Sequence, residues 1–240
     1  MGKNWTAQRF EKKYVITEEQ YLMLKERLKD ITERDEFGDT TIYNIYYDTP
    51  DFKLIRKSLT KPAYKEKFRV RSYGLANENT QIFAEIKKKY LGVVYKRRIP
   101  FKFSLLEKSD YSEVRQAINK GERQILDEMA WLFEVYEGLT PKMFISYDRE
   151  PLFTTDSSGI RITFDSNILY RTDNLTLDKD LGGTAILPEG MRVLELKAGD
   201  SIPIWISNIL NELKIYPVSY SKYGTAYQKF CEVKKNEYVA

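Results

Sequence analysis

The chain has 240 residues, of which 42% are hydrophobic and 14% aromatic, so it can bury a core. It contains no histidine, which excludes Ser-His-Asp triads, phosphohistidine intermediates and most zinc sites. The net charge of +4 is uneven, because 12 Lys and Arg stand against three Glu between Lys61 and Lys102, which leaves the rest of the chain net negative and suits this one segment to an anion.

Alternation of polar and apolar residues with a period of two predicts eight strands. In chain order they are Gln8 to Ile16, Thr41 to Asp48, Tyr64 to Tyr73, Gln81 to Tyr90, Val93 to Phe103, Met143 to Arg149, Gly159 to Ile168 and Arg192 to Lys197. Short turns such as YLGV join consecutive strands, which indicates antiparallel pairing.

Helix signals lie between and after these strands. Thr17 and Gln20 form a capping-box pattern ahead of apolar residues that repeat at helical spacing as far as Ile31. Three further helical regions are predicted. The first is Tyr111 to Glu137, which is broken at Gly121 and carries an apolar stripe of Ile125, Met129, Leu132 and Val135. The others are Ile202 to Leu213, with Pro203 in its first turn, and about Thr225 to Lys235.

Eight strands with helices between and after them predict an α+β protein in which an antiparallel sheet closes into a barrel with helices around the outside. No internal repeat or flexible linker interrupts the pattern, so we expect a single domain over residues 1–240. No apolar run reaches membrane-spanning length and the first residues lack the apolar core of a secretory signal, so a cytoplasmic protein is expected. Cys231 stands alone in a helix-like segment and is expected to be a small core residue.

Charged residues fall on one face of six predicted strands, because side chains alternate between the two faces of a strand. Phe68 and Val70, for example, point away from the four cations around them. The charged sets are Arg9, Glu11 and Lys13; Lys65, Lys67, Arg69 and Arg71; Glu85, Lys87 and Lys89; Lys96 and Arg98; Arg161, Thr163 and Asp165; and Glu195 and Lys197.

A solvated sheet face is one explanation for this pattern, since an antiparallel sheet commonly has one wet face. That explanation predicts mixed charges, whereas two neighbouring strands here are nearly all cationic, and like charges across a sheet destabilise it. A bound polyanion explains the pattern better. If the sheet closes, the cations line a tunnel whose low dielectric strengthens their attraction to a phosphate chain.

Carboxylates among these cations narrow the class of ligand. Glu11, Glu85 and Glu195 suit oxygen ligation of Mg²⁺ or Mn²⁺ that bridges phosphate oxygens. Ion pairing with adjacent Lys is an equal alternative for Glu85, and Glu195 is the preferred metal ligand. A nucleic-acid groove is disfavoured, because the aromatic residues mostly fall on the face opposite the cations.

The collinear motifs RFEKKYVI, IYYDTPD, KFRVRSYG, AEIKKK, VYKRRIPF, ISYDRE, GIRITFDSNI, VLELK and SYSKYGTAY resemble the VTC domain of polyphosphate polymerases, within the CYTH-like triphosphate tunnel metalloenzyme superfamily. The resemblance covers roughly Arg9 to Tyr227. It implies an eight-stranded tunnel and transfer of the γ-phosphate of a nucleoside triphosphate such as ATP onto inorganic polyphosphate. It also implies a Mn²⁺ or Mg²⁺ cofactor.

Roles implied by the resemblance follow the matching motifs. Glu195 is the implied metal ligand. The implied phosphate-binding residues are Lys13, Arg69, Arg71, Lys87, Lys96, Arg149, Arg161, Ser221 and Lys222, and the further tunnel lining comprises Arg9, Glu11, Lys65, Lys67, Lys89, Arg98, Asp165 and Lys197.

Two departures from the family pattern bear on activity. The hydrolytic branch of the superfamily carries ExExK on its first strand, whereas here Arg9 precedes Glu11 and Lys13, which favours the polymerase. Ser219 stands where eukaryotic polymerases tend to carry a basic residue, so one lining charge is missing. Triphosphatase activity in the same tunnel, and a non-catalytic sensor of polyphosphate or nucleotide, remain alternatives. Delivery of product to a membrane would need a separate partner, since the eukaryotic membrane parts are absent.

Overall fold

The computed structural model describes residues 10–36, 38–106, 111–199 and 201–239. The chain forms two compact units, each assembled from segments that are separate in sequence. Unit 1 comprises Met1–Thr40, Tyr147–Ile168 and Leu187–Ser221, and unit 2 comprises Thr41–Ser146, Leu169–Ile186 and Lys222–Ala240. Each unit has its own hydrophobic core. The single domain expected over residues 1–240 stays a prediction.

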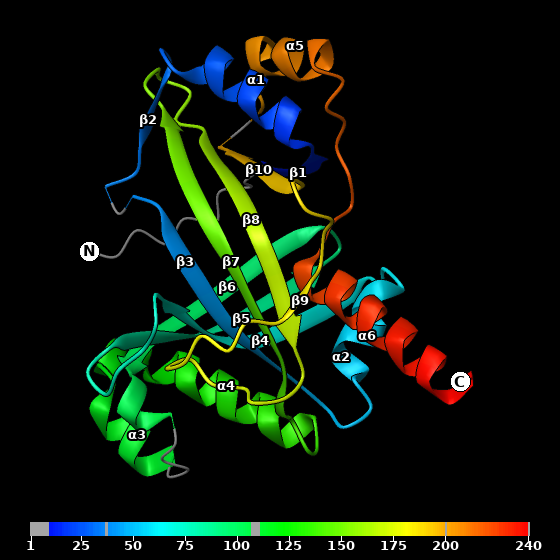
Figure 1. The fold of residues 1–240 in the computed structure, drawn as a ribbon. Helices are drawn as coiled ribbons and strands as arrows, with labels where there is room; N and C mark the ends of the chain where they lie inside the picture. The colour runs from blue at the N-terminus through cyan, green and yellow to red at the C-terminus, as the bar shows by residue number, and fades with distance from the viewer. Residues whose placement is uncertain (1–9, 37, 107–110, 200, 240) are drawn as a thin grey trace. The chain divides into compact units, whose positions relative to one another are not determined.

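The main strands follow one another in a sheet in the order β1, β10, β8, β7, β3, β4, β5, β6 (Figure 1). Every pair with a defined register is antiparallel, which confirms the predicted α+β class with helices packed around an antiparallel sheet. The strands are β1 (Phe10–Ile16), β3 (Thr40–Asp48), β4 (Tyr64–Tyr73), β5 (Gln81–Tyr90), β6 (Val93–Lys102), β7 (Thr140–Thr154), β8 (Arg161–Arg171) and β10 (Arg192–Ala198).

The predicted strands match the structure best where one face is polar. The bounds of β4 and β5 are the predicted ones, whereas β7 extends beyond the prediction at both ends. The residues missed in β7 lie at its two ends and include Pro141 and Pro151, and a proline within a run argues against a central strand. The short strands β2 (Thr32–Arg34) and β9 (Thr184–Ala185), which pair with β7 and β8, were not predicted because they are too short to show a period.

In unit 1, the helices α1 (Glu18–Leu28) and α5 (Ile204–Glu212) contact each other and pack against the apolar face of β1, β8 and β10. The capping box is confirmed, because the Gln20 N–H donates to Thr17 Oγ1 and the Thr17 N–H donates to Gln20 Oε1. Pro203 is the residue that caps α5, so the prediction that it lies in the first turn was wrong.

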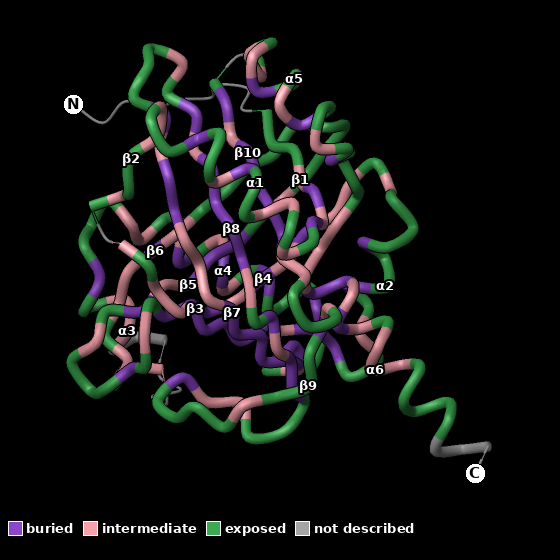
Figure 2. Tube along the Cα trace, turned by 45° about the horizontal axis from the view of Figure 1, so that its top comes forward, coloured by how far each residue is buried: buried purple, intermediate pink, exposed green. Residues whose placement is uncertain are grey.

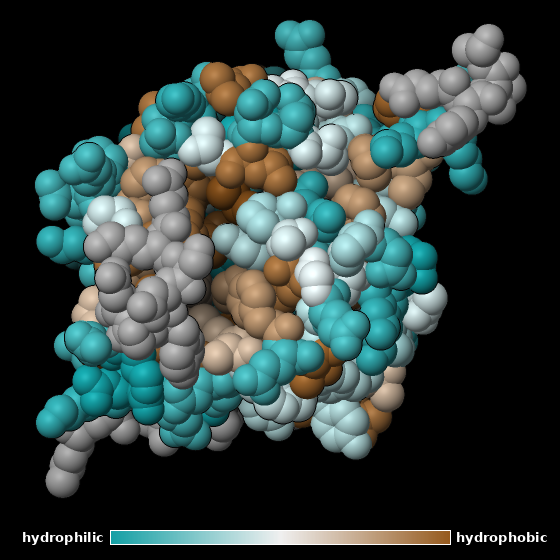
Figure 3. Space-filling view, turned by 90° about the horizontal axis from the view of Figure 1, so that it is seen from below, coloured by the Kyte–Doolittle hydropathy of each residue, from teal (hydrophilic) through white to brown (hydrophobic). Residues whose placement is uncertain are grey.

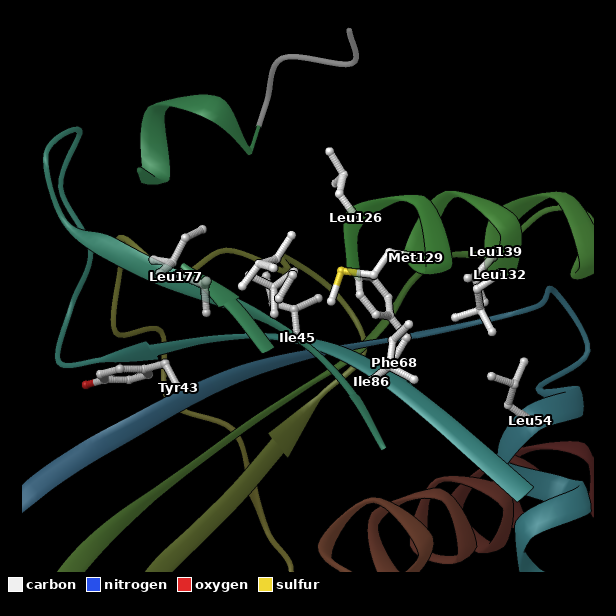
Figure 4. Packing of buried hydrophobic residues seen from close by; sticks show 14 of the residues in the cluster. Tyr43, Ile45, Leu54, Phe68, Ile86, Leu126, Met129, Leu132, Leu139 and Leu177 are labelled. Carbon is white, nitrogen blue, oxygen red and sulfur yellow. The ribbon is translucent and has the colours of Figure 1, made fainter. Parts of the chain in front are cut away.

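In unit 2, helix α4 (Arg123–Val135) packs its buried residues Leu126, Met129 and Leu132 on the apolar face of β4 to β6 (Figure 4). The predicted apolar stripe was partly wrong, because Val135 is 47% exposed and Ile125 lies only at the edge of the core. The predicted break at Gly121 is confirmed. It falls in the short 3₁₀ segment η2 (Lys120–Glu122) between α3 (Tyr111–Ala117) and α4, and a second such segment, η1 (Phe103–Leu105), follows β6.

Two further helices of unit 2 lie side by side in Figure 1. Helix α2 (Lys53–Leu59) was not predicted, and α6 (Lys222–Val239) begins three residues before the predicted start. Phe52 packs against the rings of Tyr227 and Phe230 at this contact. Cys231 in α6 is half-buried, so the prediction of a core residue was wrong. Figure 2 shows how burial concentrates in the strands while the outer end of α6 is exposed.

Among the described helices, none is both long enough and apolar enough to cross a bilayer.

Candidate functional site

Cationic side chains cover one face of β4, β5 and β6 in unit 2, as the alternation predicted. The register pairs Arg69 with Glu85 and Glu85 with Arg98, and it brings Lys67, Lys87 and Lys96 into one row across the three strands. Phe68, Val70 and Ile86 lie on the other face, within the hydrophobic core. The charged residues that share the first face are Lys65, Lys67, Arg69, Arg71, Glu85, Lys87, Lys89, Lys96, Arg98 and Lys102.

Glu85 is the centre of this cationic face. Its side chain is 2% exposed, and four cationic groups lie within 4.0 Å of its carboxylate. The nearest approaches are Arg69 Nη2 to Oε2 at 2.7 Å and Lys96 Nζ to Oε1 at 2.8 Å, followed by Arg98 Nε at 3.4 Å and Arg71 Nε at 4.0 Å. We refer to these five residues as the Glu85 cluster.

Charge attraction keeps Glu85 ionised despite its burial. Burial by itself raises the pKa of this carboxyl, but Arg69, Arg71 and Lys96 outweigh that effect and hold the pKa far below its usual value. The pKa of Lys96 is lowered, chiefly by burial, although Glu85 opposes the shift. Since one carboxylate meets four cations, the cluster carries an excess of positive charge that a polyanion would stabilise.

Strand β3 orients the two arginines of the cluster. Arg69 Nη1 donates to the Tyr46 hydroxyl at 2.8 Å, and Arg71 Nε donates to Asn44 Oδ1 at 2.8 Å. The Asn44 amide in turn donates to the carbonyl of Ile145. Sequence reasoning missed Asn44 and Tyr46, although their places two residues apart in a predicted strand would have put them on one face.

The start of α6 is tied to the same cluster through aromatic packing. The Tyr223 ring stacks on Tyr46 with 4.5 Å between centroids, and the Tyr223 hydroxyl donates to Asp48 Oδ2 at 2.9 Å. Asp48 also accepts the backbone N–H groups of Leu54 and Ile55, so it holds the first turn of α2. The IYYDTPD and SKYG motifs therefore have a structural role here. Lys222, the predicted phosphate ligand, is the first residue of α6, and Ser221 directly precedes it.

A second charged cluster lies in unit 1 on β1 and β10. Glu195 is opposite Lys13 across the β1–β10 pair, and Glu11 is opposite Lys197. Lys13 Nζ lies 3.2 Å from Glu11 Oε1 and 3.6 Å from Glu195 Oε2, and Lys197 forms a close ion pair with Glu195. We refer to Glu11, Lys13, Glu195 and Lys197 as the Glu195 cluster.

Glu195 is ionised for the same physical reason as Glu85. Its side chain is 7% exposed, and this burial raises the pKa of the carboxyl. Lys197, Lys13 and Arg149 together overcome that effect, so the net pKa lies far below the usual value. The carboxylate therefore carries its charge at neutral pH.

Two predicted phosphate ligands of unit 1 form ion pairs with acidic side chains. Arg149 donates from Nε and Nη2 to the two carboxylate oxygens of Asp165, at 2.7 and 2.8 Å. Arg161 Nη2 lies 3.2 Å from Asp35 Oδ2. In these two pairs each cation is matched by one carboxylate, in contrast to the Glu85 cluster.

The residues around Glu195 fit a hard divalent cation that is also bound by phosphate oxygens. Glu195 pairs with Thr163 across β10 and β8, and the buried Thr163 hydroxyl has no hydrogen-bond partner in the described part of the chain. Carboxylate and hydroxyl oxygens are ligands that Mg²⁺ and Mn²⁺ accept. Within the described residues no group of three or more His, Cys, Asp or Glu side chains is arranged to hold a metal alone, so substrate oxygens would have to complete the coordination.

Three other residues predicted for the site differ in their surroundings. Glu85 fits a metal poorly, because four cations already surround its carboxylate. Lys65 donates to the Ser58 carbonyl at 3.2 Å, and burial lowers its pKa, as do Lys89 and Lys61. Arg9 lies outside the described residues.

The solved structures that match this chain include two of low sequence identity. A "putative adenylate cyclase" from Vibrio parahaemolyticus is 12% identical, with a TM-score of 0.45 and coverage of 91% of this chain and 97% of that one. A "putative adenylyl cyclase" from Hippeastrum, described as having a dominant triphosphatase activity, is 12% identical, with a TM-score of 0.49 and coverage of 92% and 96%. No curated protein matches this chain.

The family comparison is decisive because it spans most of the sequence, including every described strand and both charged clusters. The VTC domain model matches residues 8–231. The chain therefore belongs to the VTC domain family.

Proposed function

We propose that this protein is a metal-dependent polyphosphate polymerase that transfers the γ-phosphate of ATP onto a growing inorganic polyphosphate chain. Membership of the VTC domain family supports an enzyme that handles triphosphates. Transfer to polyphosphate is the more specific step of the proposal. It agrees with the sequence of the first strand. Glu11 and Lys13 match the end of the ExExK pattern of the hydrolytic branch, but Arg9 replaces its first glutamate.

The Glu85 cluster is the observation that carries the proposal. Four cations around one buried carboxylate repel one another, and a structural ion pair needs only one of them. A row of phosphates would relieve this repulsion, because each phosphate places negative charge between neighbouring cations. Arg69 and Arg71 are held by Tyr46 and Asn44, so they are preorganised for bidentate contacts with phosphate oxygens.

The proposed site binds and orients phosphate, because phosphoryl transfer depends mainly on in-line positioning and charge neutralisation. Glu195 would hold Mg²⁺ or Mn²⁺, which supplies neutralisation of charge on the γ-phosphate when bound. The proposed phosphate ligands are Lys13, Arg69, Arg71, Lys87, Lys96, Arg149, Arg161, Ser221 and Lys222, with Arg9, Glu11, Lys65, Lys67, Lys89, Arg98, Asp165 and Lys197 as further lining.

Absence of histidine is compatible with this reaction, because the terminal phosphate of polyphosphate is already ionised and needs no general base. Hydrolysis would instead require a group that orients water. Glu85 is a weak base for that purpose, since its cationic neighbours depress its pKa. We also propose a cytoplasmic location and a separate membrane partner for any delivery of product.

The test is incubation of the pure protein with ATP and Mn²⁺ or Mg²⁺, with products resolved by length on a polyphosphate gel. Polymerisation predicts a ladder of long chains that Glu195→Gln and Arg69→Ala both abolish. Leu22→Asn is a matched control, because Leu22 is an exposed residue of α1 outside both clusters. Release of free phosphate without chain growth would identify a triphosphatase, and binding without turnover would identify a sensor.

A further inference from the structure

The tip of the β5–β6 hairpin in unit 2 exposes a run of large apolar residues that neither the core nor the phosphate-binding proposal explains. Five such residues are exposed within six positions, and Leu91 at the turn is 68% exposed. The run comprises Tyr90 (52%), Leu91 (68%), Val93 (42%), Val94 (47%) and Tyr95 (47%). Scattered exposed apolar residues are ordinary, whereas a contiguous exposed group at a hairpin turn indicates a binding surface.

The backbone at the turn makes the apolar choice unusual. Tyr90 pairs with Val93, so Leu91 and Gly92 form a two-residue turn, and both have positive φ angles, 46° and 90°. Turns of this kind strongly favour Asn-Gly or Asp-Gly, because Asn and Asp tolerate the left-handed conformation. Leucine is disfavoured in this conformation and gains little from packing when it is exposed. The presence of leucine at this position therefore indicates a role in binding and not in the folding of the hairpin.

Cations surround the apolar tip. Lys88 and Arg97 flank it on the face that carries the core, where both contact the single carboxylate of Glu128, at 3.7 and 3.6 Å. Lys87, Lys89 and Lys96 flank it on the opposite face. The strand ends that support the tip therefore carry more positive than negative charge.

Aromatic residues complete the pattern at the base of the tip. Tyr90 and Tyr95 bracket the aliphatic residues, and the 52% exposed Trp131 of α4 lies beneath Lys88, with 5.9 Å between Nζ and the ring centroid. Tyr and Trp concentrate at the boundary between water and lipid, aliphatic residues enter the acyl region, and Lys or Arg bind anionic headgroups. The tip and the strand ends that support it present all three classes.

We propose that the β5–β6 hairpin tip docks this protein on the surface of an anionic lipid bilayer, with Leu91, Val93 and Val94 inserted among the acyl chains. Lys88 and Arg97, which are not among the proposed ligands of the triphosphate, would contact lipid phosphates. A hollow with hydrophobic lining also lies on unit 2, between α4 and the sheet (Figure 3), but no observation defines what fills it. The hairpin tip differs from this hollow because the cations beside it favour an anionic partner. This inference does not depend on the proposed reaction, since vesicle binding is measured without ATP or metal.

The test is co-sedimentation of the full chain with phosphatidylcholine vesicles that contain or lack phosphatidylglycerol, at low and high salt. We expect binding only to the anionic vesicles, weakened by salt. Leu91→Asn should weaken the partition by about tenfold through lost apolar burial, and Leu91→Asp should weaken it further by charge repulsion. Both replacements suit the turn better than leucine does, so each variant should unfold at the wild-type temperature or slightly above it, and nucleotide turnover in solution should be unchanged.

The matched control is Leu181→Asn, at a 51% exposed leucine of unit 2 that lies in a loop next to Asp180. It should bind anionic vesicles as the wild type does. Three results would overturn the proposal: wild-type protein that stays in the supernatant, equal binding to neutral vesicles, or equal losses from the Leu91 and Leu181 substitutions. A dimer in light scattering that Leu91→Asn dissociates, without vesicle binding, would assign the tip to a second copy of the chain instead.

Discussion

The two units place a buried glutamate at the centre of a charged sheet face in different ways. In unit 2, Glu85 faces four cations and no other described carboxylate within its cluster. In unit 1, Glu195 faces Lys13 and Lys197, and Glu11 shares Lys13 with it. Both carboxylates have a strongly depressed pKa, so ionisation alone does not distinguish them.

The balance of charge distinguishes the two faces. An excess of cations, as in the Glu85 cluster, is stabilised by an anion. A face on which Arg149 is already bound by Asp165 and Arg161 by Asp35 has less need of one and can accept a divalent cation. The difference favours the strongest phosphate contacts in unit 2, and weaker phosphate contacts together with metal binding at Glu195 in unit 1.

Glu195→Gln should have the largest effect on activity. The substitution keeps the size of the side chain but removes the charge that would bind the metal, so we expect turnover to fall by roughly 100-fold or more. Steady-state rates across a Mn²⁺ titration provide the measurement. A normal rate at ordinary metal concentration would show that Glu195 acts only as an ion-pair partner for Lys13 and Lys197.

Glu85→Gln should have the largest effect on stability. The substitution removes a buried negative charge that four cations share, and we expect the free energy of unfolding to fall by roughly 3 kcal/mol. Denaturant unfolding measures the change. Tripolyphosphate should restore more stability to the variant than it adds to the wild type. No restoration would argue against phosphate binding at this cluster.

Arg69→Ala and Arg161→Ala compare the two units directly. Arg69 belongs to the cluster with excess positive charge, so its loss should weaken triphosphate binding by about 2 kcal/mol, roughly 30-fold. Arg161 already contacts Asp35, so its loss should weaken binding by less than about threefold. Calorimetric titration without metal gives both values. Equal losses would mean that the charge balance does not decide where phosphate binds.

Acid titration should show the smallest effect over the physiological range. The folded-state pKa values of Glu85 and Glu195 lie below the usual value of about 4.3, so the stability these groups contribute is complete above that pH. It is lost as the pH falls toward their folded-state pKa values. Unfolding free energy should stay flat between about pH 7 and 5 and then decline, and Glu85→Gln should decline less steeply. A steeper acid loss in the variant would contradict the assigned sign.

The strand faces were predictable from the sequence, because alternation along a strand is a local property. Phe68 and Val70 against Arg69 and Arg71 already placed cations on one side of β4, and the register confirms it. The resemblance in the motifs likewise identified the family. Helix α2 escaped prediction, since seven residues give no clear period, and Pro141 and Pro151 led to a predicted strand shorter than β7.

Which charges meet is a property of the tertiary structure. The residue pattern already indicated that Glu85 and Glu195 lie among cations, but it left ion pairing and metal binding equally open for Glu85. Partners such as Arg98, Tyr46 and Asn44 come from neighbouring strands, and pairing across strands depends on register and not on sequence distance. Pairing of β5 with β4 and β6 gave Glu85 its four cations, and β8 supplies the carboxylate that binds Arg149 of β7. The charge balance is a sum over neighbours that no single strand contains.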